Sequence, residues 1–184
     1  LRRISLGILH IIEGRGYRVS LKELVHKALA LYGDKVDSSL DTVDTVLEFI
    51  KRRFVNDCVS RGYDGGVVDG VVAVSFGDVN DGLERIKAFT AIRREPSFKV
   101  LAASYKRIRN IIKNNHETRV EAALFEEDAE SRLYALVVDL QTGIEKFLAE
   151  KEYTKALNTM LEMKEPVDTF FDDVMVMADD EAVK

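Results

Sequence analysis

Helical periodicity along almost the whole chain is the feature that most restricts its fold. Apolar residues recur three and four positions apart, whereas the strict alternation that is typical of half-buried strands is scarce. Only two prolines occur in 184 residues, so few points interrupt a helix. The valines of the segment GVVDGVVAV favour a strand, but a lone strand would have no partner, and we interpret the segment as a short helix. The predicted fold class is therefore all-α, a helical bundle that can divide into two packed helical subdomains.

Glycines and capping residues set the expected helix boundaries. Ser20 is placed to cap a helix, with Glu23 three residues later as in a capping box, and Gly33 is placed to end it. Pro96 is expected in a break. The helices besides the short valine-rich one are expected at residues 2–13, 21–32, 41–61, 78–94, 98–114, 126–149, 152–164 and 167–177. The longest apolar line, on 41–61, contains Val43, Val46, Leu47, Ile50, Phe54 and Cys58.

The composition indicates a globular protein of the cytosol. Hydrophobic residues make up 46% and charged residues 32% of the chain, which is unlike a disordered protein. No apolar run approaches the roughly 18 to 20 residues that cross a bilayer. The opening LRRISLGILHII has a basic start and then apolar residues, but no small-residue cleavage site follows, so we exclude a signal peptide. The single cysteine excludes an internal disulfide and a cysteine-rich zinc site.

Both ends of the sequence suggest a piece of a longer protein. The chain opens inside an amphipathic pattern without an initiator methionine, and it closes at MADDEAVK. Asp179 or Asp180 could cap a helix there, but that helix would have barely one turn, which is not stable alone. We therefore expect further chain beyond Lys184.

Charge is unevenly distributed along the sequence. The net charge of the chain is −5, yet residues 1–98 carry +1, residues 99–120 carry +5 and residues 121–184 carry −11. The stretch SYKRIRNIIK at 104–113 has four basic side chains and no acidic one. The basic segment is thus a local feature beside a strongly acidic last third.

As a helix, this stretch separates apolar from basic positions. Lys106, Arg109 and Lys113 share one face, and Arg107 and Asn110 form a neighbouring line. Lysine and arginine neutralise phosphates, arginine and asparagine can read base edges, and Tyr105 could stack on an unpaired base. The competing interpretation is a solvated face whose charges pair with the acidic third of the chain. From these residues alone, the solvated face is the simpler interpretation.

No other part of the sequence assembles a site. The histidines His10, His26 and His116 lack a partner at metal-ligand spacing, and no nucleotide-binding glycine motif is present. Cys58 lies on an apolar helix face and is expected in the core rather than as a nucleophile. The acids Asp172, Asp173, Asp179, Asp180 and Glu181 are better explained as helix-end charges than as a metal cluster. We expect no catalytic residue and no metal site in this chain.

Four segments resemble one family, in family order. EPVDTFFDDVMVMADDEAVK at 165–184 resembles the end of the β subunit of the bacterial-type, two-subunit glycyl-tRNA synthetase, and its PVDxFFDxVMVMADDE pattern is the most specific match. LRRISLGIL at 1–9, KRIRNIIK at 106–113 and ALFEEDAE at 123–130 also resemble family segments. The resemblance therefore covers essentially the whole chain.

This resemblance implies a role in attaching glycine to its tRNA with ATP. Catalysis, with ATP and Mg²⁺, would belong to the glycyl-tRNA synthetase α subunit of a heterotetramer, so that this chain has no catalytic site and no cofactor of its own. Residues 1–95 would be the end of an HD-like helical region, although the HD dipeptide is absent. Residues 97–184 would be a truncated anticodon-binding helical bundle that binds glycine tRNA, away from any membrane.

The expected tRNA-binding residues have two origins. Lys106, Arg107 and Asn110 match the KRxxN segment of the family, whereas Arg109 and Lys113 follow from the basic face. The alternative function is a helical protein–protein interaction module without RNA binding. In that case Lys106, Arg109 and Lys113 should be buried in salt bridges with the acidic helix at 126–149 or with a partner.

Overall fold

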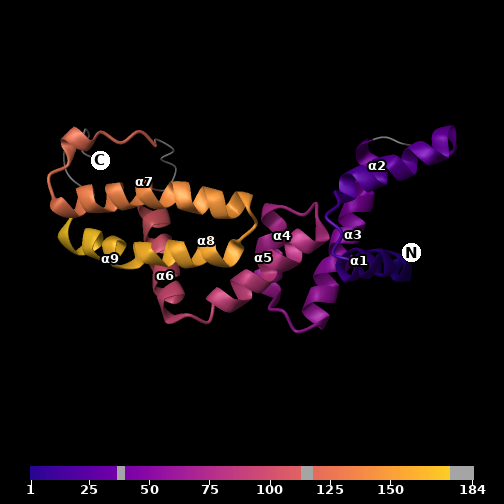
Figure 1. Ribbon diagram of the computed structural model, residues 1–184, viewed down its shortest axis with the longest axis horizontal. Coiled ribbons are helices and arrows are strands. Elements are labelled where there is room, and N and C mark those ends of the chain that lie inside the picture. Colours follow the sequence, from indigo (N-terminus) through magenta and orange to yellow (C-terminus); the bar gives the residue numbers. More distant parts are fainter. Residues whose placement is uncertain (37–39, 113–117, 175–184) are drawn as a thin grey trace. The chain divides into compact units, whose positions relative to one another are not determined.

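Every regular element in the described part of the chain is helical, which confirms the all-α prediction (Figure 1). The structure is a computed structural model that describes residues 1–36, 40–112 and 118–174. None of the described helices is both long and apolar enough to cross a membrane. The α-helices are α1 (Arg2–Gly14), α2 (Leu21–Tyr32), α3 (Leu40–Ser60), α4 (Gly65–Val74), α5 (Val79–Ile92), α6 (Pro96–Ile112), α7 (Asp128–Ala149), α8 (Tyr153–Met160) and α9 (Lys164–Asp173). Short 3₁₀ turns lie at η1 (Gly33–Lys35), η2 (Ala122–Leu124) and η3 (Leu161–Met163).

The chain divides into two compact units, Leu1–Thr90 and Ala91–Lys184. The division falls in the last turn of α5. The family match of the sequence predicted an HD-like helical end at 1–95 and an anticodon-binding bundle at 97–184. A division by contacts does not test those assignments, and they stay predictions.

The first unit is built around one apolar core. Phe54 of α3 is 2% exposed, and its ring lies 4.8 Å from the ring of Phe76 between centroids. The apolar line predicted for the long helix is confirmed at four positions, because Val43, Ile50, Phe54 and Cys58 are buried, whereas Val46 stays 36% exposed. The valine-rich segment is the predicted helix, α4, and Asp64 caps it. The core residues are Leu9, Ile12, Leu21, Ile50, Phe54, Cys58, Val68, Val71, Val72, Val79, Leu83 and Ile86.

Polar contacts fix the chain turns of this unit. The Ser20 side chain accepts a hydrogen bond from the Glu23 amide at 3.3 Å, which confirms the predicted N-cap of α2. The Asn80 side-chain amide donates to the carbonyl oxygens of Ile12 and Tyr17 at 3.1 and 2.9 Å. One side chain of α5 thereby satisfies backbone groups at the end of α1, where the helix leaves carbonyls unpaired.

An ion-pair cluster joins α1 to the segment after α3. The Arg61 guanidinium donates to both carboxylate oxygens of Glu13, at 2.8 and 2.7 Å, and to Asp57 at 3.3 Å. Asp57 also lies 3.0 Å from Nε2 of His10. The hydrogen bonds that Arg61 donates to Glu13 are the largest cause of its raised pKa. Bidentate arginine–carboxylate pairs restrict orientation, so this cluster fixes how α1 lies on α3.

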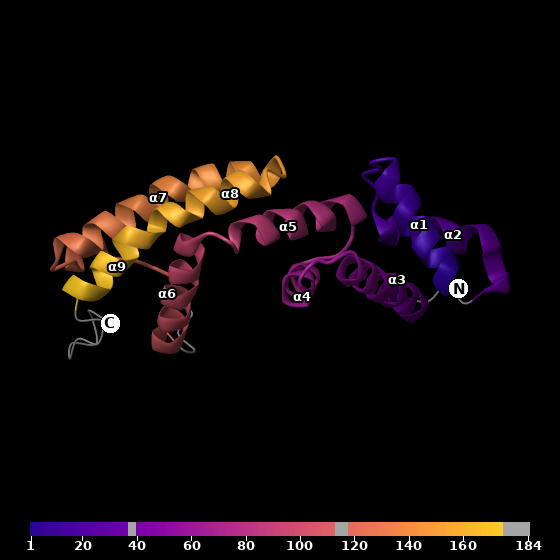
Figure 2. The same cartoon turned by 90° about the horizontal axis from the view of Figure 1, so that it is seen from below.

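The second unit is a small helical bundle with few fully buried residues. α7 and α8 lie side by side, and α9 packs against α7 (Figures 1 and 2). α7 begins with a capping box in which the Glu130 carboxylate accepts from the amide of Glu127 at 2.8 Å. In α7, α8 and α9 the buried residues are Ala129, Leu140, Ala156 and Val167. Half-buried side chains must therefore supply most of the packing of this bundle.

The two prolines lie inside first helical turns, which corrects two predicted boundaries. α6 begins at Pro96 rather than at residue 98, and α9 begins at Lys164, so Pro166 is its third residue. The helix predicted at 152–164 ends at Met160 and is followed by η3. Proline is tolerated in a first turn because the amide it lacks would have no helical partner there. The ends predicted at 114 and 177 lie outside the described residues.

A matched pair of glycine variants tests the packing of Phe54. Gly70 of α4 has open space at its Cβ position, so Gly70→Ala should raise the free energy of unfolding by about 0.5–1 kcal/mol. A Cβ at Gly82 of α5 would lie 3.2 Å from Phe54 Cζ. We expect Gly82→Ala to gain less than Gly70→Ala, or to lose stability, in urea unfolding. Equal gains for both variants would show that Phe54 is not packed as described.

Candidate nucleic-acid interface

α6 is seated on α9 and η3 by one side of the helix. Leu101, Ser104, Ile108 and Ile111 are half-buried, at the three- and four-residue spacing of one helix face. The Ser104 hydroxyl donates to Asp168 of α9 at 3.3 Å. No residue of α6 is fully buried. The basic stretch is therefore part of a surface helix whose isoleucines anchor it.

The opposite side of α6 carries the predicted basic residues. Lys106, Arg109 and Asn110 are exposed. Among the described residues, neither Lys106 nor Arg109 has an ion-pair partner. Lys99 shares their side, seven residues before Lys106, and is also exposed and unpaired in the described structure. These side chains form a solvent-facing line of positive charge that is not neutralised within the described fold. Lys113, the fifth predicted residue, lies outside the described residues.

Arg107 has a different environment from its neighbours. It is exposed, but its guanidinium carbon lies over the ring of Phe171, 3.9 Å from the centroid. Phe171 is itself edge-on to Phe170, with centroids 5.7 Å apart. A cation over an aromatic face at an exposed site contributes about 0.5–1 kcal/mol. Arg107 thus links α6 to α9 and lies beside the free basic line rather than in it.

The charge pairing required by the alternative function is not found for the described members of the line. That interpretation placed Lys106 and Arg109 in buried salt bridges either with the acidic helix, which is α7, or with a partner. Asp128 of α7 instead lies 3.8 Å from Arg132 of the same helix. The acidic third therefore leaves the described basic line available for an external anion.

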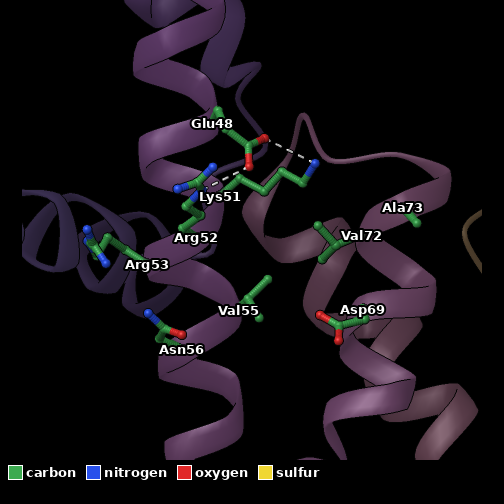
Figure 3. A pocket seen from close by; sticks show the side chains of 9 residues that line it. All are labelled: Glu48, Lys51, Arg52, Arg53, Val55, Asn56, Asp69, Val72 and Ala73. Atoms are coloured by element: carbon green, nitrogen blue, oxygen red, sulfur yellow. Dashed lines mark hydrogen bonds and ion pairs between the residues drawn. The ribbon is translucent and has the colours of Figure 1, made fainter.

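A polar groove lies between α3 and α4 in the first unit (Figure 3). It has a volume of about 440 Å³. Glu48 pairs with Lys51 at 3.3 Å and with Arg52 at 3.2 Å, and these cations lower the pKa of Glu48. Asp69 faces the groove from α4, and Arg53 of α3 also lines it (Figure 3). Because its carboxylates offset its cations, the groove is a weaker anion site than α6.

The remaining candidates have structural environments. Cys58 is fully buried, as expected of a core residue, and burial raises the pKa of its thiol to about 11. His10 and His26 are exposed, and His116 lies outside the described residues. Within the described ranges no three His, Cys, Asp or Glu side chains lie close enough together to hold a metal ion. Asp172 and Asp173 are exposed there, whereas Asp179, Asp180 and Glu181 lie outside those ranges.

Comparison with known proteins identifies the second unit. Residues 101–184 match the family described as the DALR anticodon binding domain. The whole chain is 42% identical to the glycine–tRNA ligase β subunit of Syntrophotalea carbinolica, 41% to that of Geobacter metallireducens and 31% to that of Syntrophus aciditrophicus. Over its whole length the chain is therefore similar to glycine–tRNA ligase β subunits. It spans 27% of the length of each of these relatives and matches their C-terminal part.

These similarities agree with the sequence resemblance, and the domain match covers α6 from residue 101 onward. The matched range 101–184 contains Lys106, Arg107, Arg109, Asn110 and Lys113. The structure brings Lys106, Arg109 and Asn110 to one side of α6. It does not test whether any of them touches RNA, and that part of the assignment stays a prediction.

Sequence reasoning missed two features that matter here. Lys99 could have been found, because it lies one heptad before Lys106 in the same helix. The contact of Arg107 with Phe171 joins residues 64 positions apart and gives no local signal.

Alkylation of Cys58 provides a test of its buried state. The thiolate is the reactive form, and burial keeps Cys58 neutral, so iodoacetamide at pH 8 should react far more slowly with native than with urea-unfolded protein. The raised pKa stabilises the fold below the ordinary value of 9.0, and that contribution should be lost as pH rises toward about 11. Equal native and unfolded rates, measured by mass spectrometry, would contradict this environment.

Proposed function

We propose that this chain is the tRNA-binding part of a glycine–tRNA ligase and that its second unit recognises the anticodon arm of glycine tRNA. The observation that carries the proposal is the unpaired basic line on α6, which consists of Lys99, Lys106 and Arg109. Lys106 and Arg109 lie within the range that matches an anticodon binding domain, and Lys99 lies just before it. Cations that lack a partner in the protein are available to phosphate oxygens. Asn110 on the same side adds an amide that can pair with a base edge.

The charge distribution supports one binding side. Residues 121–184 carry a net charge of −11, and this acidic surface repels an RNA backbone. Residues 99–120 carry +5. An RNA that approaches the second unit is therefore attracted to α6 and repelled by the helices that follow it.

Catalysis is assigned to another chain in this proposal. The relatives are named as β subunits, and we propose that an α subunit completes a heterotetrameric enzyme in the cytoplasm. That subunit would bind ATP and Mg²⁺ and join glycine to the tRNA. This chain would contribute affinity and tRNA selection through contacts made away from the chemistry.

Salt-dependent binding tests the phosphate role of α6. In the full-length β subunit with its partner, Lys106→Ala with Arg109→Ala should lower affinity for labelled glycine tRNA about tenfold or more at low salt. It should also reduce the slope of log K against log salt by about two, one for each phosphate contact. Fluorescence anisotropy across a salt series measures both quantities.

The matched control is Arg132→Ala on α7, which removes an exposed cation from a different helix. This variant should bind with nearly wild-type affinity and slope. If the double variant and the control behave alike, the basic line of α6 is not the binding surface.

A further inference from the structure

We propose that Arg107, seated on the Phe171 ring, is a stacking platform for one unpaired base of the RNA loop. The inference rests on the proposed function and deepens it, because it assigns base contact to one residue and phosphate contact to its neighbours. RNA-binding proteins hold splayed loop bases on aromatic rings and on the flat faces of arginine guanidinium groups.

The geometry prepares the guanidinium for such a contact. The Arg107 guanidinium carbon lies 3.9 Å from the centroid of Phe171, which is van der Waals contact with the ring face. Phe171 is half-buried and edge-on to Phe170, so the supporting ring is held in place. Arg107 itself is exposed. The ring therefore supports the guanidinium from the protein side, and the exposed side chain leaves the group accessible to a ligand.

Arg107 is not paired with a carboxylate, although acidic residues adjoin Phe171 in the sequence of α9. Asp172 and Asp173 directly follow Phe171 and are exposed, yet Arg107 forms no ion pair among the described residues. The Arg107 guanidinium packs on the Phe171 ring and not against a carboxylate. The five N–H donors at the edge of the guanidinium plane are therefore available to a ligand. A stacked base could accept from these donors or lie flat on the open face.

The charges around Arg107 favour one path for the RNA backbone across α6. Asp168, Asp172 and Asp173 make the α9 side of Arg107 unfavourable for phosphates. Lys106 and Arg109 make the outward side of α6 favourable. The sugar–phosphate backbone would therefore follow the outward side, and an uncharged base would turn toward Phe171. Arg107 lies between these two regions, which is where a base that leaves the loop stack would arrive.

Charge-conserving variants separate stacking from phosphate binding. Arg107→Lys keeps the positive charge and loses the planar face, whereas Arg132→Lys makes the same change at an exposed arginine of α7, away from the basic line. We expect Arg107→Lys in the full-length β subunit with its partner to bind glycine tRNA about fivefold to tenfold more weakly, as for the loss of one stacked base. Arg132→Lys should bind like the wild type. Both variants should keep the salt slope and the wild-type circular dichroism melting curve.

Abasic RNA identifies the stacked base directly. Glycine tRNAs with one abasic loop position at a time keep every phosphate and remove one base. At one position, wild-type protein should lose the same fivefold to tenfold affinity, and Arg107→Lys should lose nothing further. Lys106→Ala and the abasic position should each lower the affinity by their own factor, and the two factors should multiply in combination. This is expected because a phosphate contact is independent of the base.

The outcomes distinguish the inference from the function on which it rests. The stacking platform would be contradicted if Arg107→Lys bound with wild-type affinity. It would also be contradicted if the affinity losses of Arg107→Lys and of the abasic tRNA multiplied at every abasic position. If salt-sensitive binding through Lys106 persisted in that case, the proposed function would stand. If wild-type protein bound glycine tRNA no better than unrelated RNA, the proposed function itself would fail.

Discussion

The seating of α6 on α9 is the interaction on which the rest of the candidate interface depends. α6 has no fully buried residue, so half-buried side chains, the Ser104–Asp168 hydrogen bond and the Arg107–Phe171 contact hold it. This one-sided attachment leaves the opposite side free to present cations. A deeper position in the bundle would have required each lysine and arginine to be paired or desolvated at considerable expense in free energy. Surface attachment thus makes an unpaired basic line compatible with a stable fold.

The two units are stabilised by different kinds of packing. The first has a continuous apolar core that contains Phe54, with Phe76 packed against it, and it also has the Glu13–Arg61 ion pair. The second has few buried residues and depends on half-buried helix faces. Substitutions at the α6–α9 contact should therefore affect both the packing of the second unit and the position of its basic residues. Variants that keep charge and size are the appropriate way to separate these effects.

Local patterns predicted the helices well because each carries its own signal. Ser20 caps α2, Gly33 ends it, and the valine-rich segment is helical since no partner strand is present. The first-turn prolines were misjudged because a proline marks both a break and a favoured helix start. Side-chain contacts such as Arg107 on Phe171 depend on how distant helices meet, which periodicity does not encode. The basic residues could be predicted from the sequence, but their lack of partners required the fold.

The most direct test of the account is where α6 lies on bound tRNA. A photo-crosslinking residue in place of Ala103, which is exposed between Lys99 and Lys106, would report the nearest nucleotides in the intact enzyme. The same residue in place of the exposed Val138 on α7 is the control. The account predicts crosslinks from position 103 to the anticodon loop of glycine tRNA and none from position 138. Crosslinks from position 103 to the acceptor stem, or none while the tRNA is bound, would contradict it.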